Sequence, residues 1–259
     1  MHIPAKYILP MMVSLCLCSS AYAHEPKHTA KEPVSDMPDF FKEFTLINKV
    51  SLFSEYYTRG LSQTQEMPAP QFESTLVHSS GILGGIFVSR VEYFDGDQAD
   101  QELDYFIAYQ QTLENGLYYR IGGIYYTFPN AQSRLKYDFW ELDVALGYDF
   151  GPLYSELYLR TSPDHYASSG HSRYVRLAAR VPIHEKLRIK SHIAHRYIED
   201  NQTFFGIPDA FDWELGFEYT VIDNTDVMVR YVDSSFSQQD CLNSDFCSGR
   251  VVFGASYSF

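Results

Sequence analysis

The stretch Arg250-Val251-Val252-Phe253-Gly254-Ala255-Ser256-Tyr257-Ser258-Phe259 at the end of the chain decides the fold. Every second residue from Val251 to Phe259 is apolar or aromatic, and the residues between them are polar or small, with Val252 as the exception. A period of two is typical of a strand with one apolar and one wet face. Such a strand suits a membrane barrel and also a soluble sandwich, so the remaining sequence has to separate the two.

The beginning of the chain indicates export. Lys6, a mostly apolar run over 8–18 and the small-x-small motif Ala21-Tyr22-Ala23 predict a signal peptide over residues 1–23. Residues 24–44 are charged, contain proline and show no period, so we expect a periplasmic N-terminal tail. No later stretch reaches the 18 or more apolar residues of a membrane helix.

The composition is acidic and aromatic. The formal net charge is −13, and removal of Lys6 with the signal peptide gives −14. This charge argues against nucleic acid and against an anionic membrane surface as partners. The 21 tyrosines and 19 phenylalanines suit the aromatic girdles of a membrane barrel.

Twelve segments of about ten residues alternate between apolar and polar side chains. The connections between them alternate in length, with short Gly-, Asn- or Pro-containing turns on one side and longer polar loops on the other. The even count puts both termini on one side, as in an outer-membrane barrel. We therefore expect an all-β fold, a transmembrane antiparallel up-and-down barrel over residues 45–259 that contacts outer-membrane lipid. The segments are 45–58, 70–79, 82–93, 102–113, 117–128, 137–149, 152–161, 172–182, 186–198, 211–221, 225–233 and 249–259.

Alternation also assigns side chains to the two faces of the barrel. Charge on the lipid face costs about 2–4 kcal/mol for Arg or Lys at the midplane, so charged residues are expected in the lumen. The predicted basic pore-lining residues are Arg120, Arg160, Arg176, Arg180, Arg188, Lys190, Arg196, Arg230 and Arg250, with Arg59 and Arg90 in the first segments. The predicted acidic ones are Glu55, Glu73, Asp104, Glu141, Asp143, Asp149, Glu156, Asp212, Glu214 and Glu218, together with Asp226.

The predicted lumen has segregated charges. The basic residues of segments seven to nine would face the acidic residues of segments four, six and ten across a narrow pore, which would orient dipolar or ionic solutes. Alternatively, the charges pair across the lumen and plug it. Twelve strands enclose more room than the eight that side chains alone can fill, which favours a narrow water-filled channel.

The remaining motifs give little indication of catalysis or metal binding. Cys241 and Cys247 predict a local disulfide in an oxidising compartment, with two free thiols as the alternative. A rim hydrolase would need adjacent Ser and His side chains, and only His78-Ser79-Ser80 and His171-Ser172 are candidates. The first lies at a predicted periplasmic turn and the second in a loop, so we expect no catalytic residue, no metal site and no cofactor.

The first hairpin carries a family resemblance. Ser51-Leu52-Phe53-Ser54-Glu55-Tyr56-Tyr57-Thr58-Arg59-Gly60-Leu61-Ser62-Gln63, followed by Pro68-Ala69-Pro70-Gln71, resembles the opening signature of the TorF family of porins, the Gcw_chp family. The motif residues are Arg59, Gly60, Ser62 and Gln63, and the cysteine loop is a departure from it. The resemblance implies a membrane pore of undefined solute. We expect Gly60 to supply a tight turn and Arg59 a charge at the rim.

The end of the chain is also similar to outer-membrane barrels, whose last strand carries terminal aromatic residues. That similarity implies that Tyr257 and Phe259 form the signal read by the barrel assembly machinery. Three functions remain open. The chain is expected to be a monomeric porin for small hydrophilic, charged solutes. The alternatives are a closed structural or adhesive barrel that acts through its loops and a phospholipase-like rim hydrolase.

Overall fold

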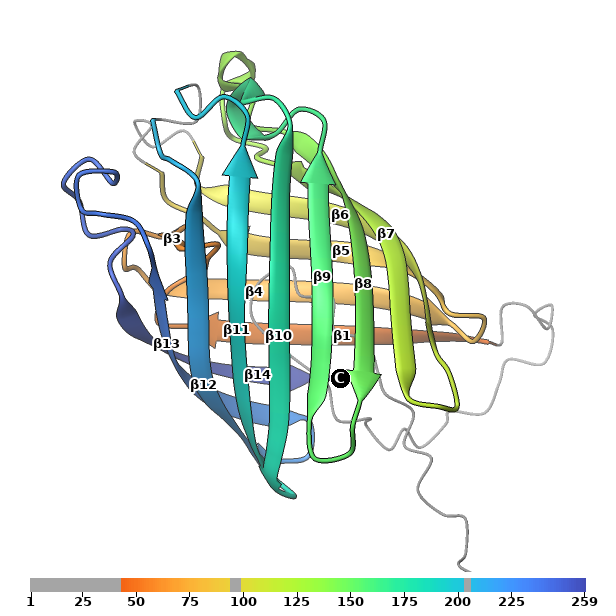
Figure 1. Cartoon of the computed structure of the whole chain (residues 1–259). Coiled ribbons are helices and arrows are strands. Elements are labelled where there is room, and N and C mark those ends of the chain that lie inside the picture. Colours follow the sequence, from red (N-terminus) through yellow and green to blue (C-terminus); the bar gives the residue numbers. More distant parts are fainter. Residues whose placement is uncertain (1–42, 94–98, 203–205) are drawn as a thin grey trace, which may run out of the picture.

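A computed structural model describes residues 43–93, 99–202 and 206–259, so the predicted signal peptide 1–23 and residues 24–42 of the predicted tail lie outside the described residues. Within the described ranges, twelve long antiparallel strands form one closed barrel (Figure 1). The strands are β1 (Phe44–Phe53), β4 (Ala69–His78), β5 (Ile82–Arg90), β6 (Gln101–Thr112), β7 (Leu117–Thr127), β8 (Phe139–Asp149), β9 (Tyr154–Ser162), β10 (Ser172–His184), β11 (Leu187–Ile198), β12 (Ala210–Ile222), β13 (Thr225–Ser234) and β14 (Arg250–Ser258). The predicted up-and-down barrel is confirmed.

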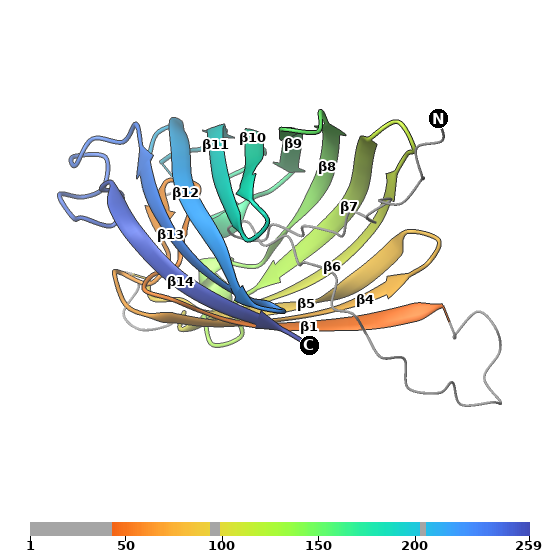
Figure 2. The same ribbon diagram turned by 90° about the horizontal axis from the view of Figure 1, so that it is seen from below.

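The barrel closes between its first and last strands, which lie side by side in Figure 2. Lys49 pairs with Ser258 and Phe53 with Gly254. Asn48 and Phe259 exchange two backbone hydrogen bonds of 2.9 Å. The C-terminal strand thus has a partner on each side, because β13 pairs along its other edge. Among the described strands, the barrel sheet therefore has no open edge.

The connections are short at one end of the barrel and long at the other, as the sequence predicts. Residues 79–81, 113–116, 150–153, 185–186 and 223–224 form the short turns. Gly81 and Gly116 have φ angles of +95° and +86° in two of these turns, a region that favours glycine. The long loops gather at the opposite end, along the top and left of the barrel in Figure 1. Two single-turn 3₁₀ helices, η1 (Ser133–Leu135) and η2 (Tyr166–Ser168), lie in these loops.

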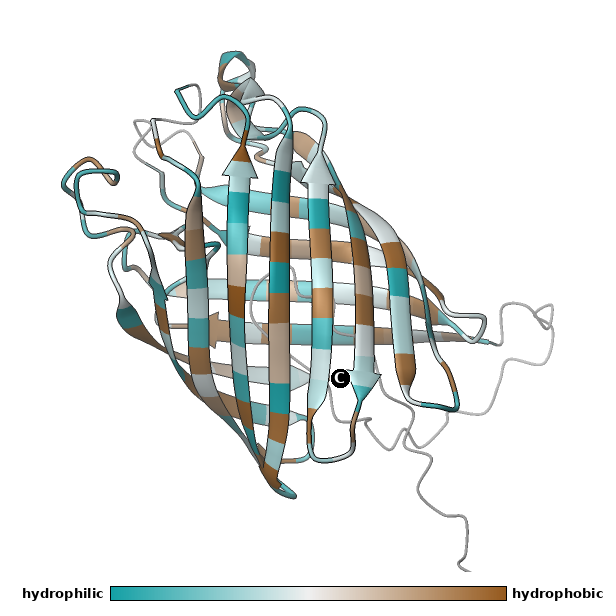
Figure 3. Cartoon of the chain, in the orientation of Figure 1, coloured by the Kyte–Doolittle hydropathy of each residue, from teal (hydrophilic) through white to brown (hydrophobic). Residues whose placement is uncertain are grey.

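The two faces of the barrel differ in polarity, which Figure 3 shows as alternating bands along each strand. On β8, Leu142, Val144 and Leu146 are exposed on the outside, while Glu141 and Asp143 are buried inside. A closed barrel with an apolar outer surface satisfies its backbone internally, which is what a bilayer requires. Among the described residues, no helix is both long and apolar enough to span a membrane.

Val252 breaks the alternation of the last strand for a structural reason. It points inward and is fully buried, where it packs in a cluster with Phe53, Met228 and Val232. Gly254 leaves room for the Phe53 ring, since a Cβ at Gly254 would lie 2.3 Å from Phe53 Cδ1. The inner surface at this seam is therefore partly apolar.

The first strand is shorter than predicted. The sequence predicts a strand over 45–58, but β1 ends at Phe53. Residues 54–68 instead form an inner hairpin, with the two-residue strands β2 (Tyr57–Thr58) and β3 (Leu61–Ser62) paired with each other. The residues Glu55, Tyr56 and Tyr57 are all buried in succession, which a strand with one face in lipid cannot provide.

Candidate functional site

The inner hairpin reaches across the lumen through Arg59. Its guanidinium donates two hydrogen bonds to Glu141 on β8, of 2.8 and 2.6 Å, and lies 5.0 Å from the centre of the Tyr174 ring on β10. In the strand order of the barrel, four strands separate β1 from β8 on the shorter side. The prediction that Arg59 is a rim charge is therefore wrong. Continuation of the chain as a hairpin inside the barrel, not as a strand, carries Arg59 inward.

Arg59 is a permanent cation in this position. Burial by itself lowers the pKa of the guanidinium, but the adjacent Glu141 carboxylate outweighs this effect and raises the pKa above its ordinary value. A bidentate Arg–carboxylate pair is among the strongest polar contacts in proteins. The pair therefore ties the hairpin to the opposite wall.

The other motif residues shape the hairpin. Gly60 has a φ of +81°, and a Cβ there would lie 2.9 Å from Ser234 Cβ and 3.1 Å from the Phe236 ring. The predicted tight turn at Gly60 is present, and the close approach to β13 is a second reason for glycine. Tyr93 donates a hydrogen bond of 3.0 Å to the side chain of Gln63.

A bridged loop holds the hairpin from the external side. Cys241 and Cys247 form a disulfide with a Cα–Cα distance of 6.2 Å, in the loop between β13 and β14. Within this loop, Phe246 accepts a 2.6 Å hydrogen bond from the Ser62 backbone N–H, and the Cys247 carbonyl accepts a 3.4 Å bond from the Tyr57 hydroxyl. The disulfide thus restricts the loop that contacts the motif.

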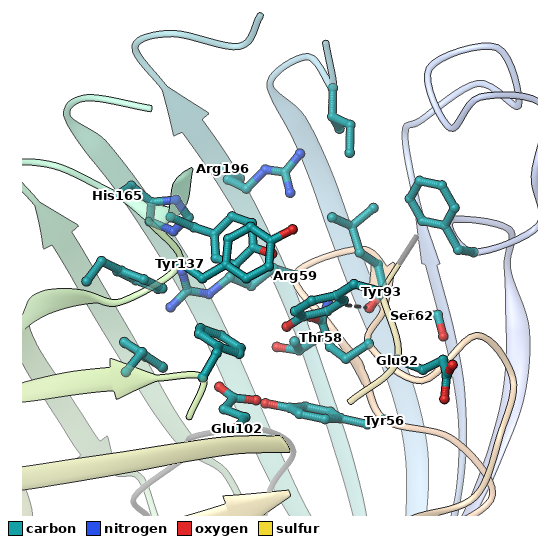
Figure 4. A pocket seen from close by; sticks show the side chains of 18 of the residues that line it. Tyr56, Thr58, Arg59, Ser62, Glu92, Tyr93, Glu102, Tyr137, His165 and Arg196 are labelled. Atoms are coloured by element: carbon teal, nitrogen blue, oxygen red, sulfur yellow. Dashed lines mark hydrogen bonds between the residues drawn. The ribbon is translucent and has the colours of Figure 1, made fainter. Parts of the chain in front are cut away.

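Beside the hairpin lies an outer cavity of about 210 Å³ (Figure 4). The external ends of the strands and the long loops form its wall. Its aromatic lining consists of Tyr56, Tyr93, Tyr126, Phe128, Tyr137, Phe139, Tyr166 and Phe246. Its charged or titratable lining consists of Arg59, Glu92, Glu102, Arg160, His165 and Arg196. The cavity therefore combines an apolar wall with a few polar groups, the composition of a small-molecule site.

His165 enters this cavity from the loop before η2. Its ring lies 4.4 Å from the Phe139 ring, centre to centre, and its Nε2 is 3.9 Å from Glu141. Burial lowers the pKa of His165 to about 3, although Glu141 acts in the opposite direction. His165 is therefore neutral at physiological pH.

Three charged residues of the cavity lining belong to a larger group that we call the crossing cluster: Arg59, Glu102, Asp104, Glu141 and Arg160. Arg160 donates a 2.8 Å hydrogen bond to the Tyr126 hydroxyl, which in turn donates to Glu141 at 2.9 Å. Glu102 accepts a hydrogen bond from Tyr56, beside which it lies in Figure 4. Asp104 is fully buried, and neither of its carboxylate oxygens has a hydrogen-bond partner among the described residues.

A second group of charges, which we call the ladder, runs over β11, β12 and β13: Arg188, Lys190, Glu214, Glu218, Asp226 and Arg230. Lys190 lies 2.6 Å from Glu218, and Arg188 lies 2.6 Å from Glu218 and 2.8 Å from Asp226. Arg230 lies 2.7 Å from Glu214. Each contact joins side chains on neighbouring or next-neighbouring strands.

The expected arrangement of basic and acidic walls on opposite sides of the lumen is wrong. The acidic strands β8 and β12 lie directly beside the basic strands β9 to β11, because the barrel keeps sequence order. Charges therefore meet where these strands adjoin: Arg160 on β9 lies 4.0 Å from Glu141 on β8, and Lys190 on β11 lies 2.6 Å from Glu218 on β12. Other pairs form elsewhere in the wall, between Arg120 and Asp143 and, at 3.5 Å, between Arg176 and Glu156. His192 likewise lies 3.0 Å from Asp212.

The other predicted lumen residues are placed as follows. Arg180 stacks over Tyr154, Arg196 donates to the Pro208 carbonyl at 3.2 Å, and Arg250 donates to Glu55 at 3.0 Å. Glu73 contacts the Thr75 hydroxyl at 3.1 Å. Two assignments need correction. Asp149 is exposed at the end of β8 and accepts a hydrogen bond from the Gly151 N–H of the adjacent short turn. Arg90 pairs in register with exposed Gln101, on the outer face of β5.

Sequence reasoning missed several residues of the site. Glu102 lies on the same face of β6 as Asp104, so the alternation that identifies one identifies the other. Lys49 pairs in register with Glu73 and could have been found in the same way. His165 lies in a loop without a period, and the sequence marks it only as part of a weak acid/His group, Asp164-His165 with His171.

The two Ser/His pairs differ in their contacts. His78 Nδ1 lies 2.8 Å from the Ser80 hydroxyl, and the same nitrogen accepts a 3.1 Å bond from the Ser80 backbone N–H, as in a local turn. His171 Nε2 contacts the Thr161 hydroxyl at 3.1 Å, not Ser172. In the described part of the chain, no group of three or more His, Cys, Asp or Glu side chains is arranged to hold a metal ion.

Comparison with known proteins gives a family and a fold. A family model described as "Bacterial protein of unknown function (Gcw_chp)" matches residues 41–252. The NanC porin structure aligns with a TM-score of 0.55 at 10% identity, covering 83% of this chain and 99% of that chain. Salmonella typhi OmpF, in complex with daunomycin, aligns with a TM-score of 0.46 at 9% identity, covering 83% and 97%. No curated protein matches the sequence.

Proposed function

The chain belongs to the Gcw_chp family, and we propose that it is an outer-membrane channel for small hydrophilic solutes that is constricted by its own first external loop. The main support for this proposal is the inner hairpin, which the Arg59–Glu141 pair fixes across the lumen of a closed barrel. A loop folded into a barrel narrows the passage and places fixed charges in it. The electric field and the width of the passage at such a constriction determine which solutes cross it.

We further propose that the channel lies in the outer membrane and is inserted there by the barrel assembly machinery. The apolar exterior supports insertion among outer-membrane lipids, and the exposed Tyr257 and Phe259 at the last strand suit recognition by the barrel assembly machinery. We propose a monomer without catalytic activity. The proposed lack of catalytic activity is supported by the turn at His78, where a single ring nitrogen contacts both the hydroxyl and the backbone N–H of Ser80.

A closed barrel that acts through its loops is the second candidate, and the same hairpin favours it. The hairpin and the paired charges of the ladder occupy part of the lumen. The two candidates differ in whether ions cross the membrane.

Conductance in planar lipid bilayers separates them. We expect stepwise currents from the purified, refolded chain, and heat-dependent gel mobility as the check that the barrel is folded. A folded barrel that gives no current steps over a wide voltage range would exclude the channel and leave the closed barrel. The reversal potential in a salt gradient then reports the ion preference.

A further inference from the structure

The bridged loop between β13 and β14 supplies the backbone acceptors that hold the paired part of the inner hairpin. The Cys241–Cys247 disulfide closes this loop, and the carbonyl groups of Phe246 and Cys247 belong to the closed segment. Phe246 accepts a 2.6 Å hydrogen bond from the Ser62 backbone N–H, and Cys247 accepts a 3.4 Å bond from the Tyr57 hydroxyl. Both donors lie on the two short strands of the hairpin. The bridge therefore restricts the backbone that these two donors contact.

Arg250 clamps the two legs of the hairpin, and the bridged loop sets its orientation. Its guanidinium donates to the Asp245 carbonyl inside the bridged segment and, at 2.9 Å, to the Ser248 carbonyl just after it. The same guanidinium lies 3.0 Å from Glu55 and 3.1 Å from Glu66. Glu55 follows the end of β1, and Glu66 precedes the start of β4. Because a guanidinium is planar with its N–H donors in a fixed fork, the bonds to the loop determine how it faces the two carboxylates.

The bridge and the hairpin also share one apolar cluster. Cys241 and Cys247 are 0% and 3% exposed and pack in the same buried cluster as Tyr56 and Leu61 of the hairpin. Close-packed side chains transmit the displacement of a neighbour. The bridged loop is thus an anchor for the hairpin at the wall formed by β13 and β14, separate from the contact with Glu141 at the opposite wall.

We propose that the Cys241–Cys247 bridge positions the constriction, because it keeps the external side of the inner hairpin docked. The hairpin then has two anchors, the bridged loop and the Arg59–Glu141 pair. When the bridge is absent, the hairpin stays tied through Arg59 and moves about that point, so the width of the passage fluctuates. As a statement about how the constriction is held in place, this inference rests on the proposed function.

The test combines hydrogen–deuterium exchange, read by mass spectrometry on the full, refolded barrel in detergent, with single-channel recording. In the double variant Cys241→Ser with Cys247→Ser, peptides that cover residues 54–68 should exchange at least tenfold faster than in the unmodified chain. Peptides from two other long loops, 129–138 and 163–171, should keep their exchange rates. The current should fluctuate rapidly between levels, whereas the unmodified chain should give steady steps.

Two further variants separate the anchor from a general effect of mutation. Glu66→Gln keeps the bridge and removes one of the carboxylates that Arg250 contacts, so it should raise exchange over 54–68 by a smaller factor. Ser244→Ala is the matched control inside the bridged segment. The backbone bond from Ser244 N–H to the Cys241 carbonyl remains in this variant, so exchange and current should both stay unchanged.

Unchanged exchange over 54–68 in the double variant overturns the proposal. Faster exchange in all the long loops alike also overturns it, because the bridge would then stabilise the barrel as a whole. Gel mobility establishes that each variant is folded. Should the double variant not fold, Arg250→Gln keeps the bridge and decides by the same exchange criterion. Because exchange needs no current, faster hairpin exchange without conductance would count against the channel alone, and unchanged exchange in a conducting barrel against this anchor alone.

Discussion

The two groups of buried charge in the lumen are held in different ways. The ladder joins three cations to three carboxylates on β11 to β13, with contacts of 2.6–2.8 Å between nearby strands. The crossing cluster has two cations against three carboxylates, and its central pair joins residues 82 positions apart in the chain. The ladder has equal numbers of cations and carboxylates and joins nearby strands, whereas the crossing cluster connects an inner loop to the opposite wall. We infer that the ladder stabilises the wall and that the cluster governs passage.

The strongest test of this contrast is Arg59→Ala. Removing one partner of a buried ion pair costs about 3–5 kcal/mol, which shifts the docking equilibrium of the inner hairpin by a factor of roughly a hundred or more. We expect single-channel conductance to rise severalfold. Arg59→Lys should give an intermediate value, because an ammonium cannot form the bidentate contact with Glu141.

Arg134→Ala is the control for Arg59→Ala, since Arg134 is an exposed arginine of η1 and should leave the current unchanged. If Arg59→Ala conducts like the unmodified chain, the hairpin does not constrict the lumen.

The ladder gives the opposite expectation. Glu214→Ala leaves Arg230 buried and without its carboxylate, which should lower the free energy of unfolding by about 3–5 kcal/mol. The current per channel should stay close to that of the unmodified chain. Urea denaturation in detergent and bilayer recordings measure the two quantities.

The double variant Glu214→Leu with Arg230→Met sharpens the point. Replacing both partners of a buried pair by apolar residues is often neutral or stabilising, so most of the lost stability should return. A double variant as unstable as Glu214→Ala would show that the pair is not an independent unit of the wall.

The sequence predicts the ladder well and the crossing cluster poorly, for a physical reason. Alternation places Lys190, Glu214 and Glu218 on the inner face, because β11 and β12 keep one register through these positions. It fails at Glu55-Tyr56-Tyr57, where the chain leaves the barrel wall and all three side chains become buried. A strand that continues and a hairpin that turns inward share the same aromatic composition.

The pairing within the cluster depends on closure of the barrel. Arg59, in the hairpin after β1, meets Glu141 on β8 because closure of the barrel places these two strands on different sides of one lumen. The spacing of residues along the sequence does not predict this contact across the lumen. The unpartnered state of Asp104 likewise depends on where both arginines point, which only the folded chain defines.

The smallest expected effect comes from His165, which touches the cluster without adding charge at neutral pH. Burial lowers its pKa from the ordinary 6.5 to about 3, so the folded chain binds this proton less readily than the unfolded chain. Above pH 6.5 neither state holds the proton and stability is unaffected. Between pH 6.5 and about 3 the unfolded chain takes it up, and each unit of acidification costs at most about 1.4 kcal/mol.

His165→Gln should remove this contribution, so its unfolding midpoint should fall less steeply than that of the unmodified chain between pH 6.5 and 4.5. Carboxylates elsewhere titrate in both proteins, and the difference between the two slopes isolates His165. Parallel slopes would mean that His165 reaches solvent when it is protonated and that the Phe139 contact does not exclude water. Because burial and Arg59 both lower the pKa of His165, a shallower slope in Arg59→Ala would in turn link the docking of the hairpin to the burial of this ring.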